Sequence, residues 1–164
     1  ELTSAPADSG GKSTFDEQLL KALKDEQQVL SESTGRYVPL AVKVAPDLTE
    51  EEVDGIAECL LETNIDALIA TNTTLNRDKV EGLAHGAEAG GLSGAPVTEQ
   101  STKIIAMFAE KLKEQIPIIG VGGVVTGKDA QDKIDAGSSL VQVYSGLIYK
   151  GPSLVKECVD RLVS

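Results

Sequence analysis

The sequence has 164 residues, with 15 Lys and Arg against 26 Asp and Glu, which gives a formal net charge of −11. Hydrophobic residues make up 41% and charged residues 25%, a composition typical of one globular domain and not of a disordered chain. The acidic balance and the aromatic content of 3% argue against binding to duplex or single-stranded nucleic acid.

Membrane spans and metal sites are also not predicted. No apolar run reaches the roughly 18–20 residues that a membrane span needs, and the first residues do not resemble a signal peptide. The two cysteines, Cys59 and Cys158, lie far apart among helix formers, and His85 is the one histidine. This pattern fits neither a zinc site nor a disulfide framework, so we expect two core cysteines in a reducing compartment.

The first elements are a loop, a helix and a strand. Residues 1–14 are small and polar without periodicity, which predicts a loop, and residues 15–164 form the rest of a single domain. Apolar residues recur at helical spacing from Phe15 to Ser33, and Gly35 ends that helix. Residues 38–44 are a short apolar run that predicts a buried strand.

A capping box begins the next helix, because Thr49 can cap a backbone N–H group while Glu52 reaches back to the cap. The apolar residues behind it have amphipathic helical spacing. Residues 66–71 predict another buried strand. The connection that follows, residues 72–96, has a length that is usually functional.

The remaining elements alternate in the same way: a helix over 99–114, a strand over 117–121, a helix over 126–136, a strand over 139–144 and a closing helix opened by Pro152. One helix followed by four strand–helix units, with strands buried on both faces, predicts a parallel α/β sheet with right-handed crossovers. Four such strands make either a small open sheet or half of a (β/α)₈ barrel, which needs about 250 residues.

Polar residues gather where the predicted strands end, which is where ligands bind in parallel α/β folds. Lys43 lies near the end of an apolar strand, so its cation is either aimed at an electron-rich ligand or extended to solvent. Thr71, Asn72 and Thr73 follow the next strand and offer donors and acceptors for a flat heterocycle with amide-like edges. Alternatively, these three residues form a polar turn that only caps the strand.

Two glycine clusters, residues 90–94 and 120–123, predict a phosphate site. Without a Cβ atom, their backbone N–H groups can approach phosphate oxygens closely. Tyr144, Ser145 and Gly146 close the last strand and add further donors. Phosphate sites after the last two strands are common in eight-stranded barrels, so the clusters together favour a phosphorylated cofactor.

Five segments occur in an order and spacing that resemble the C-terminal half of a class 2 dihydroorotate dehydrogenase. They are Ala41–Leu48, Ala70–Thr74, Gly90–Pro96, Ile118–Gly123 and Leu140–Gly146. This family is the quinone-linked flavoenzyme of pyrimidine synthesis, and the sequence is especially similar to its proteobacterial members.

The resemblance implies a (β/α)₈ TIM barrel that holds FMN at the carboxyl ends of its strands. It implies that Lys43 contacts the flavin ring, that Thr71 contacts FMN, and that Asn72 and Thr73 bind the pyrimidine substrate. The flavin phosphate and ribityl chain would be held by backbone groups of Gly94, Gly122, Gly123, Tyr144 and Ser145.

Two departures from the family pattern concern the N-terminal side. The family's first half, with its membrane-associating helices and four barrel strands, is not encoded here. The family also places a Ser that acts as general base after its fourth strand. Here Ser4 fits that position only with a shift of three residues. We expect the full-length family protein to be cytoplasmic and peripheral on the inner membrane through the region absent here, and this chain by itself to be soluble.

Three hypotheses therefore remain at this point. In the first, the chain is part of an FMN-dependent enzyme that oxidises dihydroorotate to orotate with quinone as acceptor, completed by the missing N-terminal half. In the second, it is a half-barrel that folds alone or pairs with itself and binds a phosphorylated ligand without turnover. In the third, it is an inactive segment.

Overall fold

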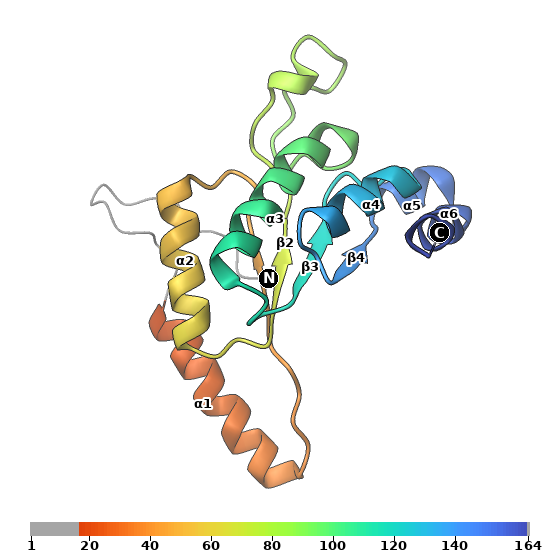
Figure 1. Ribbon diagram of the computed structural model, residues 1–164. Coiled ribbons are helices and arrows are strands. Elements are labelled where there is room, and N and C mark those ends of the chain that lie inside the picture. Colours follow the sequence, from red (N-terminus) through yellow and green to blue (C-terminus); the bar gives the residue numbers. More distant parts are fainter. Residues whose placement is uncertain (1–16, 164) are drawn as a thin grey trace.

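A computed structural model describes residues 17–163, and a parallel four-stranded sheet lies at its centre (Figure 1). The strands pair in chain order and are β1 (Ala41–Val44), β2 (Ala67–Ala70), β3 (Ile118–Val121) and β4 (Leu140–Gln142). The α-helices are α1 (Glu17–Thr34), α2 (Glu50–Glu62), α3 (Thr98–Leu112), α4 (Gly127–Asp135), α5 (Ser145–Lys150) and α6 (Ser153–Leu162). Two short 3₁₀ helices, Asp78–Val80 and Ala95–Val97, lie in the connection between β2 and α3.

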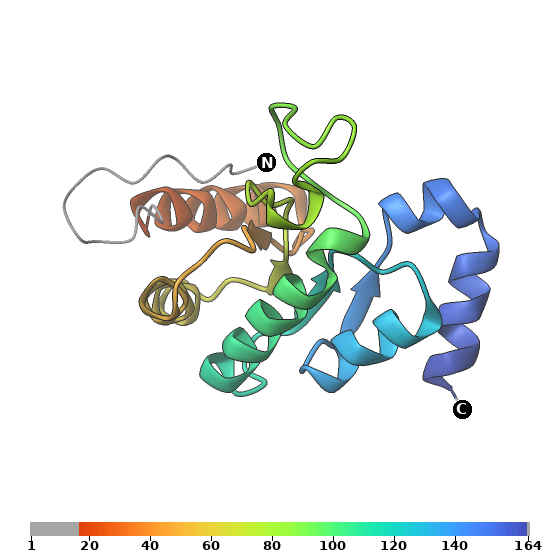
Figure 2. The same ribbon diagram turned by 90° about the horizontal axis from the view of Figure 1, so that it is seen from above.

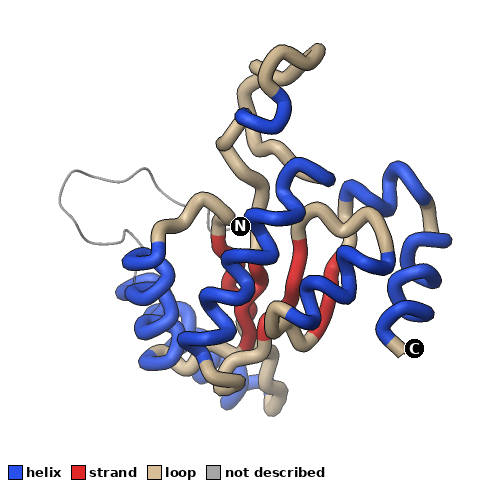
Figure 3. The backbone as a smooth tube through the Cα atoms, turned by 45° about the horizontal axis from the view of Figure 1, so that its top comes forward, coloured by secondary structure: helices blue, strands red, loops and turns tan. Residues whose placement is uncertain are grey.

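The helices form an arc around one side of the sheet when the molecule is viewed from above (Figure 2). The backbone tube shows the same layering, with the strands inside the helices and the connection after β2 projecting beyond the strand ends (Figure 3). Each pair of neighbouring strands is parallel and joined through a helix. The architecture is the parallel α/β sheet that the strand–helix order predicts, and it is consistent with the half of a (β/α)₈ barrel that the family resemblance implies.

The two faces of the sheet differ in burial. On the face toward the helices, the strand residues Val42, Val44, Leu68, Ala70 and Ile118 are buried. The opposite face carries the paired row Lys43, Ile69, Ile119 and Leu140, in which Leu140 is 61% exposed. The expectation that the strands are buried on both faces was therefore wrong, because the helices cover one face only.

The main core lies between the sheet and helices α2 and α3, and Phe108 and Leu60 are among its fully buried side chains. A smaller cluster joins α4 to α6 and includes Cys158. Both cysteines are free and buried, as expected of core residues. Within residues 17–163, no helix is long and apolar enough to cross a membrane, and no group of metal-ligating side chains gathers at one place.

Within residues 17–163, the predicted helices and strands are confirmed, with shorter strands and one additional α-helix. The loop predicted over residues 1–14 lies outside the described residues. The capping box of α2 is present, with Glu52 N–H donating to Thr49 Oγ1 at 3.3 Å and Thr49 N–H donating to the Glu52 carboxylate at 2.8 Å. A second capping box, Thr126 with Asp129, begins α4. Helix α5 was not predicted, because its six residues are too few to show a helical period.

The carboxylate of Asp66 ties α1 to the N-terminal ends of β1 and β2. It accepts hydrogen bonds from Leu40 N–H at 2.8 Å, Tyr37 Oη at 2.5 Å and Gln27 Nε2 at 3.2 Å, and Lys24 Nζ lies 3.6 Å away. Partial burial by itself raises the pKa of Asp66, but these contacts outweigh it and hold the pKa below its ordinary value of 3.8.

Replacing Asp66 with Asn should lower the free energy of unfolding at pH 7 by about 1–3 kcal/mol, because the donors lose a charged acceptor. The contribution of ionised Asp66 is complete above its ordinary pKa of 3.8 and is lost as the pH falls through the lower folded-state value. Urea unfolding at pH 7 and about pH 3 measures both effects. Glu32→Gln, which removes an exposed carboxylate of α1, is the control; equal stability of the two variants at pH 7 would contradict this role.

Candidate functional site

A cavity of about 300 Å³ opens at the carboxyl ends of the four strands. Nine of the site residues predicted from the sequence line it, namely Lys43, Thr71, Asn72, Thr73, Gly94, Gly122, Gly123, Tyr144 and Ser145. The cavity wall also includes Ser93, Val97, Val121, Val124, Gln142 and Gly146. Ser4, the candidate general base, lies outside the described residues, so its place relative to the cavity stays a prediction.

The turn after β3 forms one wall of the cavity, and its geometry requires glycine. Gly122 and Gly123 have φ values of +110° and +75°, which side chains disfavour. A Cβ atom on Gly123 would also lie 2.6 Å from the backbone nitrogen of Thr98, at the start of α3. The glycines therefore allow the turn to pack directly against the N-terminal end of this helix.

The carbonyl groups of this turn are held by side chains of α3. Ser101 Oγ donates to the Gly122 carbonyl oxygen at 2.8 Å, and Thr98 Oγ1 donates to the Gly123 carbonyl oxygen at 2.8 Å. Among the described residues, the backbone N–H groups of Gly122, Gly123 and Val124 donate no hydrogen bond. Because Gly123 and Val124 are buried, these donors require a partner that the described residues do not supply.

The opposite wall follows β1 and β2. Lys43 is half-buried, and its ammonium group makes no ion pair or hydrogen bond within residues 17–163. Asn72 N–H donates to the Val44 carbonyl oxygen at 2.7 Å, which fixes the backbone beside β1. The Asn72 side-chain oxygen accepts from Thr73 N–H at 2.9 Å. This bond orients the amide and leaves its NH₂ group available to a ligand.

The connection over residues 72–96 joins the two walls. An antiparallel bridge pairs Thr74 with Leu92, with N–H to oxygen distances of 3.0 and 2.8 Å. Past the bridge, Ser93 Oγ lies 2.8 Å from Ser145 Oγ at the start of α5. The long loop thereby brings one glycine cluster beside the end of β4.

Asp47, in the segment between β1 and α2, anchors the base of this loop and also bonds α3. Its carboxylate accepts hydrogen bonds from Thr74 Oγ1, from Leu75 N–H at 2.9 Å and from Gln100 Nε2 at 2.9 Å. Arg77 adds a contact to the Gly90 carbonyl oxygen across the loop. These bonds hold Asn72 and Thr73 at the strand end although their loop is long.

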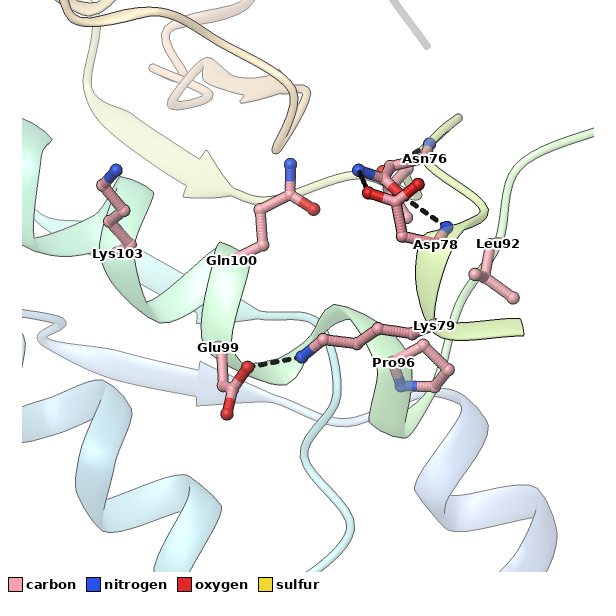
Figure 4. Close-up of a pocket in the computed structure, with 9 residues that line it drawn as sticks. Asn76, Asp78, Lys79, Leu92, Pro96, Glu99, Gln100 and Lys103 are labelled. Carbon is pink, nitrogen blue, oxygen red and sulfur yellow. Dashed lines mark hydrogen bonds and ion pairs between the residues drawn. The ribbon is translucent and has the colours of Figure 1, made fainter. Parts of the chain in front are cut away.

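A second cavity, of about 320 Å³, lies on the outer side of the same loop (Figure 4). Four of its polar side chains bond in pairs: Lys79 pairs with Glu99, and Asn76 Nδ2 donates to the Asp78 carboxylate at 3.1 Å. The first cavity instead has backbone N–H groups, those of Gly122, Gly123 and Val124, that donate to no acceptor among the described residues. The first cavity is therefore the better candidate for a ligand site.

Comparison with known proteins identifies the family. Residues 3–164 match the family model described as dihydroorotate dehydrogenase. The chain belongs to the dihydroorotate dehydrogenase family. It is 58% identical over 147 residues to the dihydroorotate dehydrogenase (quinone) of Pseudomonas fluorescens Pf-5, and 58% identical over 148 residues to that of Nitrosomonas eutropha. The resemblance to class 2 proteobacterial members is thus confirmed.

Solved structures of this family share the fold. A dihydroorotate dehydrogenase from Eimeria tenella, crystallised with ferulenol, superposes with a TM-score of 0.83 at 35% identity and covers 97% of this chain. The ligand-free form from the same organism gives a TM-score of 0.80 at 37% identity. The chain spans 47% and 45% of these two structures and 43% of each bacterial relative named above.

Some residues of the cavity wall were not singled out from the sequence. Val97, Val121 and Val124 have the apolar character of ordinary core positions, so no signal marks them. Gln142 alternates with Val141 and Val143 in the last strand, and a polar residue at that position is a signal that could have been used. Ser93 and Gly146 lie within the motifs that carry the family resemblance.

Replacing Asp47 with Ala should release the base of the loop without changing the sheet. Hydrogen exchange of the Thr74 and Leu92 amides should become roughly 5-fold faster, as expected for the loss of about 1 kcal/mol of local stability. Asp78→Ala is the matched control, because the Asp78 carboxylate bonds Asn76 within the loop itself. Unchanged exchange in Asp47→Ala would show that the anchor does not hold the loop.

Proposed function

We propose that this chain forms the flavin- and substrate-binding half of an FMN-dependent dihydroorotate dehydrogenase that uses quinone as electron acceptor. The observation that carries this proposal is that residues from all four strand ends, predicted separately from the sequence, line one cavity with unpaired donors. Family membership supports a flavin and the oxidation of dihydroorotate to orotate.

The turn at Gly122 and Gly123 fits the phosphate group of FMN. Its unpaired N–H groups, with that of Val124, can donate to phosphate oxygens, and the positive end of α3 lies directly behind them. Ser145 adds a hydroxyl on the neighbouring strand end. Gly94 and Tyr144 line the same part of the cavity and would contact the ribityl chain through backbone groups.

The other wall suits the flavin ring and the pyrimidine. The Lys43 ammonium can approach the ring, where it would favour the extra electron density of the reduced flavin. Thr71 is 2% exposed, and its hydroxyl bonds the Asn72 carbonyl oxygen at 3.0 Å, so it supports the turn that borders the flavin. The free amide NH₂ of Asn72 and the hydroxyl of Thr73 would bind the carboxylate and ring of dihydroorotate.

Catalysis would need groups outside the described residues. When bound, FMN would supply the acceptor for a hydride from C6 of dihydroorotate, and a base would be needed to take the proton from C5. Ser4 stays the candidate base, and an aliphatic hydroxyl serves as one only if its proton can be passed on. We expect an N-terminal half-barrel to complete the site and to provide membrane and quinone contacts at the cytoplasmic side of the inner membrane.

A second candidate function is binding without turnover by a self-associating half-barrel. The exposed inner row of the sheet favours it, because Leu140 and the free edges of β1 and β4 can pair with another copy. The two candidates differ in one result. Only the enzyme half gives dihydroorotate-dependent reduction of FMN when the barrel is complete.

The phosphate site is tested by titrating the chain with FMN and with riboflavin, which lacks the phosphate group. The chain should bind FMN at least about tenfold more tightly. Gly123→Ala should remove that preference, because its Cβ would displace the turn from Thr98. Gly35→Ala is the control, since Gly35 has a similar φ of +68° with no neighbouring atom within 4 Å. Equal FMN affinity in both variants would refute the site.

The substrate site is tested in a complete barrel that contains this sequence. Asn72→Ala should reduce kcat/KM for dihydroorotate by about 5–150-fold, because a buried polar partner is worth roughly 1–3 kcal/mol. Lys43→Ala should instead impair flavin binding or reduction. Stopped-flow reduction of FMN by dihydroorotate separates the two effects, and unchanged substrate affinity and reduction in Asn72→Ala would contradict the assignment.

A further inference from the structure

Lys133 is a fully buried cation in α4, with a relative exposure of 0%. Its ammonium group donates to Ser101 Oγ at 2.7 Å, to Thr102 Oγ1 at 2.7 Å and to the Thr98 carbonyl oxygen at 3.2 Å. All three acceptors belong to the beginning of α3. The three hydrogens of the ammonium group are therefore used, and every acceptor is electrically neutral.

The charge of Lys133 is not balanced by a direct ion pair. Within residues 17–163, no carboxylate lies at ion-pair distance from its nitrogen. Burial lowers the pKa of Lys133 to about 8, although Asp129 and Asp132 in the same helix act in the opposite direction. Buried lysines are normally paired with an anion in contact, and the described residues supply Lys133 with none.

The contacts of Lys133 lead to the glycine turn of the cavity. Ser101, which accepts from Lys133, bonds the carbonyl oxygen of Gly122 at 2.8 Å. Thr98, whose carbonyl oxygen accepts from Lys133, bonds the carbonyl oxygen of Gly123 through its hydroxyl. Both carbonyl groups of the turn are thus held by α3 residues that Lys133 fixes, on the side away from the unpaired N–H groups.

We infer that Lys133 is a positioning residue for an anion-binding turn, acting through Ser101 and Thr98 to keep the carbonyl groups of Gly122 and Gly123 away from the ligand. Its charge lies behind the turn and favours an anion in front of it. A phosphate group bound at the turn supplies the counter-charge that Lys133 lacks. This inference rests on the proposed phosphate site and adds the residue that maintains it.

The test compares FMN with riboflavin in the parent chain and in Lys133→Met, which is one atom shorter and removes the charge. FMN affinity should fall by about 10–100-fold, as expected for a charged hydrogen-bonding group, whereas riboflavin affinity should stay the same. Lys128→Met is the matched control, because Lys128 lies in the same helix, is exposed and pairs with Asp132 at the surface. It should leave both affinities unchanged.

Ser101→Ala is the second variant and covers the case in which Lys133→Met does not fold. It breaks the bond to the Gly122 carbonyl oxygen and should lower FMN affinity selectively. The loss in the double variant should be smaller than the sum of the two losses, because part of the effect of Lys133 passes through Ser101. Thermal unfolding of each variant shows whether the titration reports folded protein.

The outcomes separate this inference from the proposed function. If the parent chain does not prefer FMN over riboflavin, the phosphate site fails and the role of Lys133 fails with it. If the parent prefers FMN and folded Lys133→Met keeps the same preference, the phosphate site stands and the inference about Lys133 is overturned. If Lys133→Met does not fold, Ser101→Ala is measured in its place. An unchanged preference of folded Ser101→Ala for FMN over riboflavin would then also overturn the inference about Lys133.

Discussion

The parallel register of the four strands is the constraint on which the candidate site depends. Val44 pairs with Ala70, Ala70 with Gly120 and Gly120 with Val141, so the chain leaves every strand at the same edge of the sheet. A slip of one residue in β1 would turn Lys43 toward the helices and Val44 toward the cavity. Burial of the alternate apolar residues against the helices prevents that slip and thereby fixes the cation in the site.

The shape of the cavity depends on polar side chains that hydrogen-bond to the backbone of its walls. Asp47 fixes the base of the long loop, and Ser101 and Thr98 hold the carbonyl groups of the glycine turn. Among the described residues, the N–H groups of Gly122, Gly123 and Val124 have no acceptor. This division explains why the turn suits an anion, since its acceptors are already used and its donors are not.

The strand–helix order and nine residues of the cavity wall could be predicted from the sequence, because buried parallel strands leave continuous apolar runs with polar residues at their ends. The sequence could not predict that the sheet face with Lys43, Ile69, Ile119 and Leu140 lacks a covering layer of helices. Apolar residues in a strand do not show whether such a layer is present. Ser101 and Lys133 could not be predicted either. A serine and a lysine in helices look like ordinary solvent-facing positions until packing places α3 against α4 and both against the turn.

The central claim is that the backbone N–H groups of the turn receive the phosphate group of FMN, and amide chemical shifts test it most directly. In ¹⁵N–¹H NMR spectra, FMN should shift the Gly122, Gly123 and Val124 amide protons downfield, as a charged acceptor does. Riboflavin at the same saturation should leave these signals in place while moving those near Lys43 and Asn72. Identical shifts with both ligands, or no shift at the turn with FMN, would contradict the claim.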